Sequence, residues 1–454
     1  MDIDSITLAA VTGGTVHGPL QLFSGVALDS RKAAPGDLFV AIKGPNHDGH
    51  DFVADALVKA SGALVSRSIP ESALPKDRTL IRVADTLHAL RAVARYVKET
   101  LRVRVVAITG SVGKTTTKEM AAALLSQKFR VSKTTGNLNN TIGLPAELVR
   151  MPEATECAVL EMGMSTPGEI RLLSDLVQPH AACVTAVAPA HIGNFHSLDG
   201  VMEAKAEILS GMGRDSVFVA NGDDERSVAI GTRHKGKVVT YGLAEGFDVF
   251  ATGIHEDVTA SRFTLHLGRE IHAITLPLPG RHNISNFLAA SALASSMGVS
   301  GRDIAAAAVV LAPVSHRGEV SILANDVLLY DDSYNSSPTG LRAAYAAFEA
   351  SSKGRRRIAV VGEMLELGRK SDELHQAAGK DLAGRFDVLV AVKGDAAALA
   401  SAARNAGAPP GSIHVVKDVD AAIPLVSSLL LPGDAVFVKG SRGVALDRLV
   451  EALS

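Results

Sequence analysis

The chain passes from a strand pattern to a helix pattern through the stretch Thr109-Gly110-Ser111-Val112-Gly113-Lys114-Thr115-Thr116. The apolar, largely β-branched run at residues 103–108 precedes this stretch, and the strong helix formers of residues 114–125 follow it. A glycine-containing loop between a strand and a helix aims several backbone N–H groups at one point, where they bind phosphate oxygens. The stretch therefore predicts an α/β domain built around a phosphate-binding loop.

The loop departs from the commonest phosphate-loop pattern at one position. That pattern has glycine five residues before the glycine of the Gly-Lys pair, where this chain has Ile108. Gly110 and Gly113 still allow the tight backbone path. Lys114 supplies a positive charge for the outer phosphates, and the Thr115 hydroxyl can ligate magnesium. A glycine turn beside a chance lysine is the alternative, but the lysine, the hydroxyl run and the strand–loop–helix context agree, so we expect ATP and Mg²⁺ as ligands.

Length and composition are those of a globular protein with several domains. At 454 residues, the chain is long enough for about three domains of ordinary size. The formal net charge is -2, and the one basic cluster, Arg355-Arg356-Arg357, stands before an apolar run and is interpreted as a solvated strand entrance. We therefore expect no nucleic-acid partner.

The cysteines and the apolar runs indicate the cellular compartment of the protein. Cys157 and Cys183 each lie in an apolar run typical of a buried strand, which favours reduced core thiols over a disulfide. Residues 1–11 lack an export pattern, and no run of about 18 apolar residues occurs. These features predict a cytoplasmic protein with no membrane span.

The order of apolar runs predicts an α/β protein of three domains, at residues 1–100, 101–312 and 313–454. The first is a small α/β domain with a strand at 37–42 and an amphipathic helix at 52–61. The central domain alternates strands and helices as a parallel sheet does, with strands at 158–160, 181–187 and 217–220 and an antiparallel addition over 247–278. The third is a Rossmann-like open sheet with strands at 327–330, 358–361, 388–392 and 435–438.

Two polar residues follow neighbouring strands of the central domain. Glu161 ends the run 158–160, and His191 comes just after the next apolar run. Either residue alone would be an ordinary loop group, but functional residues of open α/β sheets gather where strands end, so their matching placement predicts magnesium ligands. Lys205 lies on an expected helix, and composition alone would make it a surface lysine.

Motifs along the whole chain resemble the Mur ligase family. In the central region these are TGSVGKTTTKEM at 109–120, TTGNLNNTIGLP at 134–145, LEMG at 160–163, AHIGNF at 190–195 and AKAEI at 204–208. GRHNISNFLAA at 280–290, SHRGE at 315–319 and VKGSRG at 438–443 agree as well. The segments DSRKAAPGDLFVAIKG, DGHDF, DDSYNSSP and GEMLELG are most similar to members that join D-alanyl-D-alanine to UDP-N-acetylmuramoyl-tripeptide.

The resemblance implies ATP-driven amide formation through an acyl phosphate, in the synthesis of peptidoglycan precursors. Lys114 and Thr115 would hold the β- and γ-phosphates with a first metal ion. Glu161 and His191 would ligate metal nearer the acyl group, and Lys205 would carry a carbamate that organises it. Asn283 matches an adenine contact, while Arg317 and Asp332 match residues that reach the γ-phosphate side and the ribose, so the third domain should close over the second.

The resemblance also implies where the substrates bind. Ser30 and Arg31 match contacts to the UDP portion. Asn137, Asn139, Asn140 and Thr141 are expected to face the muramoyl peptide and phosphate, and Asn335 is a candidate contact for the dipeptide.

Two other interpretations stay open on the sequence. A sister ligase would add the third amino acid, diaminopimelate or lysine, with the same ATP site, although its usual Asp-Asn-Pro-Arg signature is absent here. A nucleotide-dependent switch would hydrolyse ATP without ligation, but it would not require Glu161, His191 and Lys205 together. We expect the chain to be a monomer.

Overall fold

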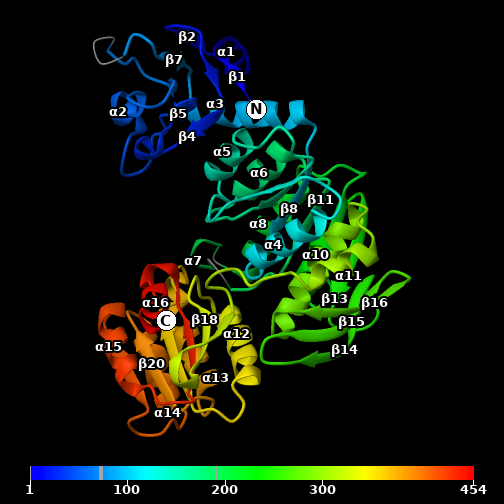
Figure 1. Ribbon diagram of the computed structural model, residues 1–454, viewed down its shortest axis with the longest axis vertical. Helices are drawn as coiled ribbons and strands as arrows, with labels where there is room; N and C mark the ends of the chain where they lie inside the picture. The colour runs from blue at the N-terminus through cyan, green and yellow to red at the C-terminus, as the bar shows by residue number, and fades with distance from the viewer. Residues whose placement is uncertain (1, 71–74, 190–191, 196) are drawn as a thin grey trace.

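The computed structural model describes residues 2–70, 75–189, 192–195 and 197–454. Figure 1 shows an N-terminal part at one end, a central part, and a C-terminal part at the other end. Each part is built on its own sheet, and we propose domain boundaries near residues 100 and 312, between these sheets. The expectation of an α/β protein with several parallel sheets is confirmed.

The N-terminal sheet is parallel except for β2, which pairs antiparallel with β7. Its order is β2-β7-β6-β5-β4, with strands at Thr15–His17, Thr79–Arg82, Gly62–Val65, Asp37–Val40 and Gly25–Ala27. The pair β1 (Ile3–Asp4) and β3 (Leu22–Phe23) lies beside it with α1 (Ser5–Thr12). Helix α3 (Thr86–Leu101) leads to the central sheet and begins where the Asp85 side chain accepts the His88 N–H at 2.8 Å.

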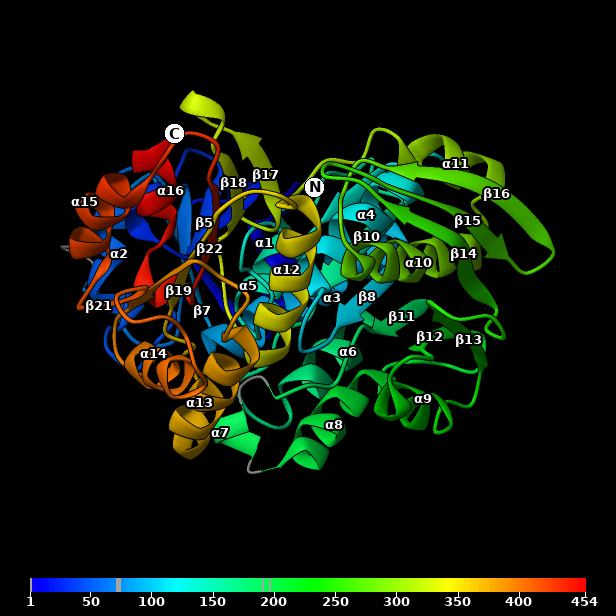
Figure 2. The same ribbon diagram turned by 90° about the horizontal axis from the view of Figure 1, so that it is seen from below.

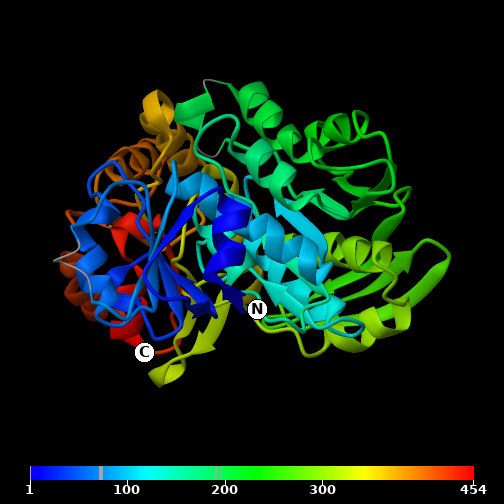
Figure 3. The same cartoon turned by 90° about the horizontal axis from the view of Figure 1, so that it is seen from above.

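The central sheet has nine strands in the order β16-β15-β14-β13-β12-β11-β8-β10-β9. The strands are Arg104–Thr109 (β8), Val131–Lys133 (β9), Cys157–Glu161 (β10), Ala181–Val184 (β11), Val217–Asn221 (β12), Lys237–Gly242 (β13), Val249–Glu256 (β14), Ser261–Leu267 (β15) and Glu270–Leu276 (β16). Strands β8 to β14 pair in parallel, and β15 and β16 extend the sheet antiparallel, as the alternating pattern over 247–278 predicts. Figure 3 shows these last strands at the outer edge of the molecule.

Helices cover the central sheet and carry the loops of the site. They are Lys114–Leu125 (α4), Gly143–Val149 (α5), Glu169–Val177 (α6), Ile192–Phe195 (α7), Leu198–Ala206 (α8), Glu225–Gly231 (α9), Arg281–Ser296 (α10) and Gly301–Ala308 (α11). Helix α10 is buried along most of its length and packs on α4. This packing fixes the position of the helix that follows the phosphate loop.

The C-terminal sheet runs in the order β17-β18-β22-β19-β20-β21 and is parallel except for β17. Its strands are Glu319–Ile322 (β17), Leu328–Asp332 (β18), Arg357–Gly362 (β19), Val388–Val392 (β20), Ile413–Val416 (β21) and Ala435–Lys439 (β22). Its helices are Pro338–Ser351 (α12), Ser371–Leu382 (α13), Ala396–Asn405 (α14), Val419–Leu429 (α15) and Asp447–Leu453 (α16). Separate apolar clusters pack on its two faces, one around Phe437 and the other around Val438.

Three expected elements are shorter than their patterns. The strand expected at 37–42 is β5 and ends at Val40, because the chain then turns and Ile42 O accepts the Gly49 N–H. The helix expected at 52–61 is α2 (Val53–Leu57), because the following residues curl into turns that deliver the chain to β6 at Gly62. The strand expected at 181–187 ends at Val184, because Thr185 and Ala186 hydrogen-bond to the phosphate loop. None of these changes alters the sheet order.

The central and C-terminal parts touch through two glycines. A Cβ on Gly193 in α7 would lie 2.8 Å from Gly368 Cα, and one on Gly368 would lie 2.5 Å from Gly193 Cα. Gly368 begins the short 3-10 helix η6 (Gly368–Lys370) that precedes α13, and Figure 2 shows α7 beside α13. Two backbones approach this closely only where side chains are absent.

Along the described residues, we find no helix with both the length and the apolar character needed to cross a membrane.

Candidate active site

The phosphate loop is fixed by contacts to the segment that follows β11. Gly110 has φ 153°, and a Cβ there would lie 1.9 Å from Thr185 Oγ1, so a side chain cannot be accommodated. The Thr185 hydroxyl donates to Val112 O at 2.6 Å, and the Ser111 N–H donates to Ala186 O at 2.7 Å. These bonds hold the loop open at the carboxyl end of β8.

The second glycine of the loop lies against α10. Gly113 has φ 82°, and a Cβ there would be 2.4 Å from Asn286 Oδ1, which also accepts the Thr117 hydroxyl at 3.3 Å. No role was expected for Asn286 from the sequence. Its spacing from Asn283, three residues along one helix, could have revealed it, because such residues share a face.

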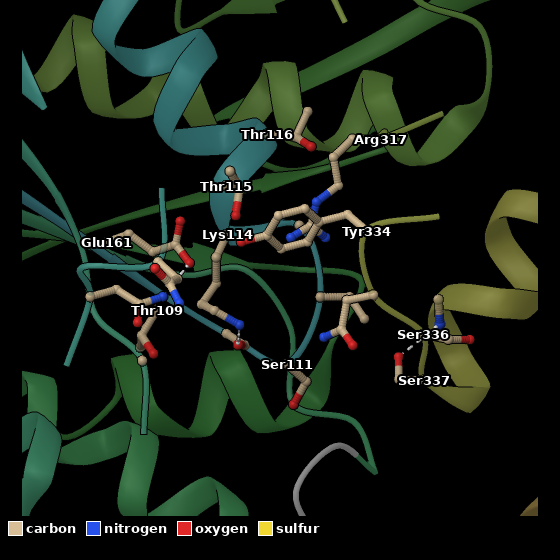
Figure 4. A pocket seen from close by; sticks show the side chains of 18 of the residues that line it. Thr109, Ser111, Lys114, Thr115, Thr116, Glu161, Arg317, Tyr334, Ser336 and Ser337 are labelled. Carbon is tan, nitrogen blue, oxygen red and sulfur yellow. Dashed lines mark hydrogen bonds between the residues drawn. The ribbon is translucent and has the colours of Figure 1, made fainter. Parts of the chain in front are cut away.

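Lys114 begins α4 and points back over its own loop. Its Nζ donates to Gly110 O at 2.8 Å. Burial lowers the pKa of Lys114, the carboxylate of Glu161 opposes this shift, and the positive charge of Arg317 adds to it. Figure 4 shows Lys114 between Glu161 and Tyr334, with Thr115 close by. This arrangement suits an anion bound over the loop.

Glu161 ends β10, the strand next to β8, so its side chain emerges beside the phosphate loop. It is 3% exposed; Oε1 accepts Asn139 Nδ2 at 2.8 Å, while Oε2 is buried without a hydrogen-bond partner among the described residues. A buried carboxylate oxygen with no donor is costly unless a cation takes it. Together with the nearby Thr115 hydroxyl, this oxygen fits Mg²⁺, which prefers oxygen ligands.

Lys205 lies on α8 and is 3% exposed, so it is not the surface lysine that composition alone suggests. Burial and the neighbouring charge of Lys114 hold the pKa of Lys205 well below its usual range. Its amine is therefore neutral over a wider pH range than that of a free lysine. His191 lies outside the described residues, and its metal role stays a prediction.

The C-terminal part supplies the opposite side of the site. Asp332 and Lys439 are register partners on β18 and β22, and Lys439 Nζ donates to Asp332 Oδ2 and, at 2.9 Å, to Asn335 O. Burial lowers the pKa of Lys439, while Asp332 opposes the shift. The Arg317 guanidinium lies over the Tyr334 ring, 4.2 Å from its centroid.

These residues enclose one pocket of about 470 Å³ between the two parts. We call its side made of Thr109–Thr116, Glu161 and Lys205 the central wall, and the side made of Arg317, Asp332, Tyr334, Asn335 and Lys439 the C-terminal wall. The other expected site residues that line the pocket are Asn137, Asn139, Asn140 and Asn283. No role was expected for Tyr334 or Lys439, because the partner of Lys439 lies 107 residues away along the chain and the contact of Tyr334 with Arg317 depends on side-chain direction.

Three expected substrate contacts lie away from this pocket. Ser30 and Arg31 form the 3-10 helix η1 (Ser30–Lys32) in the N-terminal part, where the Arg31 guanidinium is exposed and donates to both Asp29 oxygens. The pairing lowers the pKa of Asp29 to about 2. Thr141 contributes its main-chain oxygen to Arg91 at 3.4 Å. Their substrate roles stay predictions.

Family models match most of the chain. The model described as "Mur ligase family, catalytic domain" matches residues 22–97, "Mur ligase middle domain" matches 108–294, and "Mur ligase, glutamate ligase domain" matches 316–442. A protein of Escherichia coli K12 named UDP-N-acetylmuramoyl-tripeptide--D-alanyl-D-alanine ligase is 38% identical over 462 residues, which cover 99% of this chain and 98% of the relative.

Solved structures agree with the sequence matches. A crystal structure of MurF from Acinetobacter baumannii superposes with a TM-score of 0.89 at 33% identity and covers 98% of this chain and 97% of its own. MurF ligase from Thermotoga maritima in complex with ADP gives a TM-score of 0.81 at 28% identity, with coverage of 94% and 96%. The similarity therefore extends over all the parts that form the pocket.

Proposed function

The chain belongs to the Mur ligase family, and we propose that it joins D-alanyl-D-alanine to the tripeptide carboxylate of UDP-N-acetylmuramoyl-tripeptide at the expense of ATP. The reaction would be a step in peptidoglycan precursor synthesis. One observation carries the proposal: a phosphate-binding wall and a wall from another part of the chain enclose a single pocket. A ligase needs this arrangement because the peptide carboxylate, the γ-phosphate of ATP and the amine of the dipeptide must come together in a site that excludes water.

The central wall would prepare the acid for attack. Lys114 and the loop N–H groups would hold the β- and γ-phosphates while the peptide carboxylate attacks the γ-phosphorus and ADP leaves. Mg²⁺ held by Thr115 at the phosphates, and by Glu161, His191 and the modified Lys205 nearer the acyl group, would neutralise the charge of the two anions. The amine of the dipeptide then attacks the acyl carbon, a C–N bond forms, and phosphate leaves with a proton from the amine.

Lys205 fits its expected modification on chemical grounds. A carbamate forms when a neutral amine attacks CO₂, and the lowered pKa of Lys205 increases the share of that neutral amine. The product is an anion, which would place beside Lys114 a group that attracts both Lys114 and Mg²⁺.

We further propose a cytoplasmic monomer. Its cysteines support a reducing compartment, since Cys157 and Cys183 are both free and buried in strands.

The proposal is tested by ADP release from the purified full chain. Steady-state ADP release should require ATP, the UDP-tripeptide and D-alanyl-D-alanine together, because without the dipeptide the acyl phosphate is not consumed. Two UDP-tripeptides, with diaminopimelate or lysine at the third position, would identify the natural acceptor. Free diaminopimelate and free lysine, each offered with the UDP-dipeptide, serve as competing amines. Turnover of a free amino acid would point to the sister ligase, and brisk ADP release from ATP alone would point to a switch.

A further inference from the structure

Tyr334 is an aromatic residue of the C-terminal wall that contacts two arginines. The guanidinium carbon of Arg317 lies 4.2 Å from the ring centroid, and that of Arg442 lies 5.0 Å from it. Both distances are within the range in which the ring quadrupole attracts a cation. Of the two arginines, Arg317 lines the pocket, and Figure 4 shows its guanidinium against the Tyr334 ring, close to Lys114.

A second arginine–tyrosine contact in the same part of the chain shows what is unusual about the first. Arg385 lies 5.0 Å from the Tyr345 ring, but its guanidinium also donates to Glu349 and to Asp381 O. Arg317 has no such partner: within the described part of the chain its guanidinium makes no hydrogen bond or ion pair, and its Nε is buried. A buried donor left unpaired is costly, so the site suits an acceptor that comes from outside.

The charges around Arg317 indicate what that acceptor is. Arg317 and Lys114 line the same pocket, and Figure 4 shows them close together, so two cations lie near each other there. An anion between them removes that repulsion. The ring contacts the guanidinium by its face, and therefore fixes the direction of Arg317 without using its N–H donors, which a carboxylate partner would use.

We propose that Tyr334 is a positioning residue that holds Arg317 aimed at the terminal phosphate of ATP, an inference that rests on ATP being the ligand of the proposed function. The ring takes the place that Glu349 has at Arg385, and it leaves the N–H groups of Arg317 free for phosphate oxygens. Loss of the ring then weakens the contact to the third phosphate and spares the contacts to the first two.

The test compares two nucleotides on the full chain by titration calorimetry with Mg²⁺: ADP and the non-hydrolysable ATP analogue adenylyl imidodiphosphate. Tyr334→Leu should weaken the analogue about fivefold and ADP less than about twofold. Tyr334→Phe, which keeps the ring and removes the hydroxyl, should bind both within about twofold of the unaltered chain. In an Arg317→Ala background, Tyr334→Leu should cause no further loss, because the ring acts through that arginine.

Several results would overturn the proposal. Equal weakening of ADP and the analogue would indicate general damage to the pocket, and a full fivefold loss in the Arg317→Ala background would show that the ring acts on its own. Arg442→Gln is the matched control, since it removes the other cation from the same ring; a selective loss there equal to that of Tyr334→Leu would transfer the role to Arg442. A chain that binds both nucleotides as expected but does not ligate would overturn only the proposed function.

Discussion

On the central wall, Lys114 bonds the main-chain oxygen of its own loop and Glu161 keeps one buried oxygen without a donor among the described residues. On the C-terminal wall, Asp332 and Lys439 bond each other across neighbouring strands. The first wall is held by backbone geometry and offers its charges to ligands. The second wall satisfies the charges of this pair internally, and of its charged residues it leaves Arg317 for a ligand. A substitution on the central wall should therefore reduce chemistry, whereas one in the Asp332–Lys439 pair should reduce both stability and chemistry.

The largest loss of activity should follow removal of the loop lysine, Lys114, from the central wall. Lys114→Ala should lower kcat about 10³-fold, because the charge that holds the outer phosphates is lost. The unfolding midpoint should change little, since burial already disfavours this cation and its hydrogen bond to Gly110 O stays within its own loop. Steady-state ADP release measures the fall in kcat, and thermal unfolding measures the midpoint. A large fall in the unfolding midpoint would contradict the distinction between the walls.

Replacement of the buried α8 lysine tests whether the central wall needs an added anion. Lys205→Ala should lower kcat about 10²-fold, and short-chain carboxylates should restore part of the activity by taking the place of the carbamate. Activity is measured with and without added formate or acetate. Lys205→Met, which fills the space without an amine, is the control and should respond less. Unchanged activity in Lys205→Ala would exclude the modified lysine from the mechanism.

In the C-terminal wall, a substitution in the Asp332–Lys439 pair should lower the stability of the protein as well as its activity. Lys439→Met should destabilise the protein by about 3 kcal/mol, because it leaves the nearly buried carboxylate of Asp332 unpaired. The double variant Asp332→Leu with Lys439→Met should recover most of that loss in thermal unfolding. It should not recover activity, since the expected ribose contact is gone. A single variant as stable as the unaltered chain would show that the pair does not hold this wall.

The smallest expected effect concerns the contact that brings the walls together. Gly193→Ala adds a methyl group at the Gly368 backbone and should lower kcat about tenfold by hindering closure, with nucleotide affinity affected less. Gly213→Ala, where a Cβ meets no atom within 4 Å, is the matched control and should leave kcat unchanged. The two variants are compared in the ADP-release assay. Equal rates would mean that this contact does not govern closure.

The difference between the walls also explains what the sequence could predict. The phosphate loop is a local feature, so strand, glycines, lysine and helix were visible within 23 consecutive residues, 103–125, and its geometry follows from them. Glu161 could be placed because β10 neighbours β8 in a parallel sheet. Lys439 and Asp332 are separated by 107 residues, and only the strand order β18-β22 joins them. The contact between Tyr334 and Arg317 could not be predicted, because it depends on the directions of the two side chains and the periodicity of the sequence does not give these directions.

The two cysteines have a practical consequence for experiments on closure. Burial raises the pKa of both Cys157 and Cys183 to about 12, and neither side chain is exposed to solvent. Thiol reagents should therefore leave the folded chain unlabelled and react as it unfolds. The native sequence therefore needs no removal of cysteines before dyes are attached at introduced ones. One cysteine introduced on the surface of α8 and another on α13 would carry a fluorophore pair that reports the distance between the two walls during turnover.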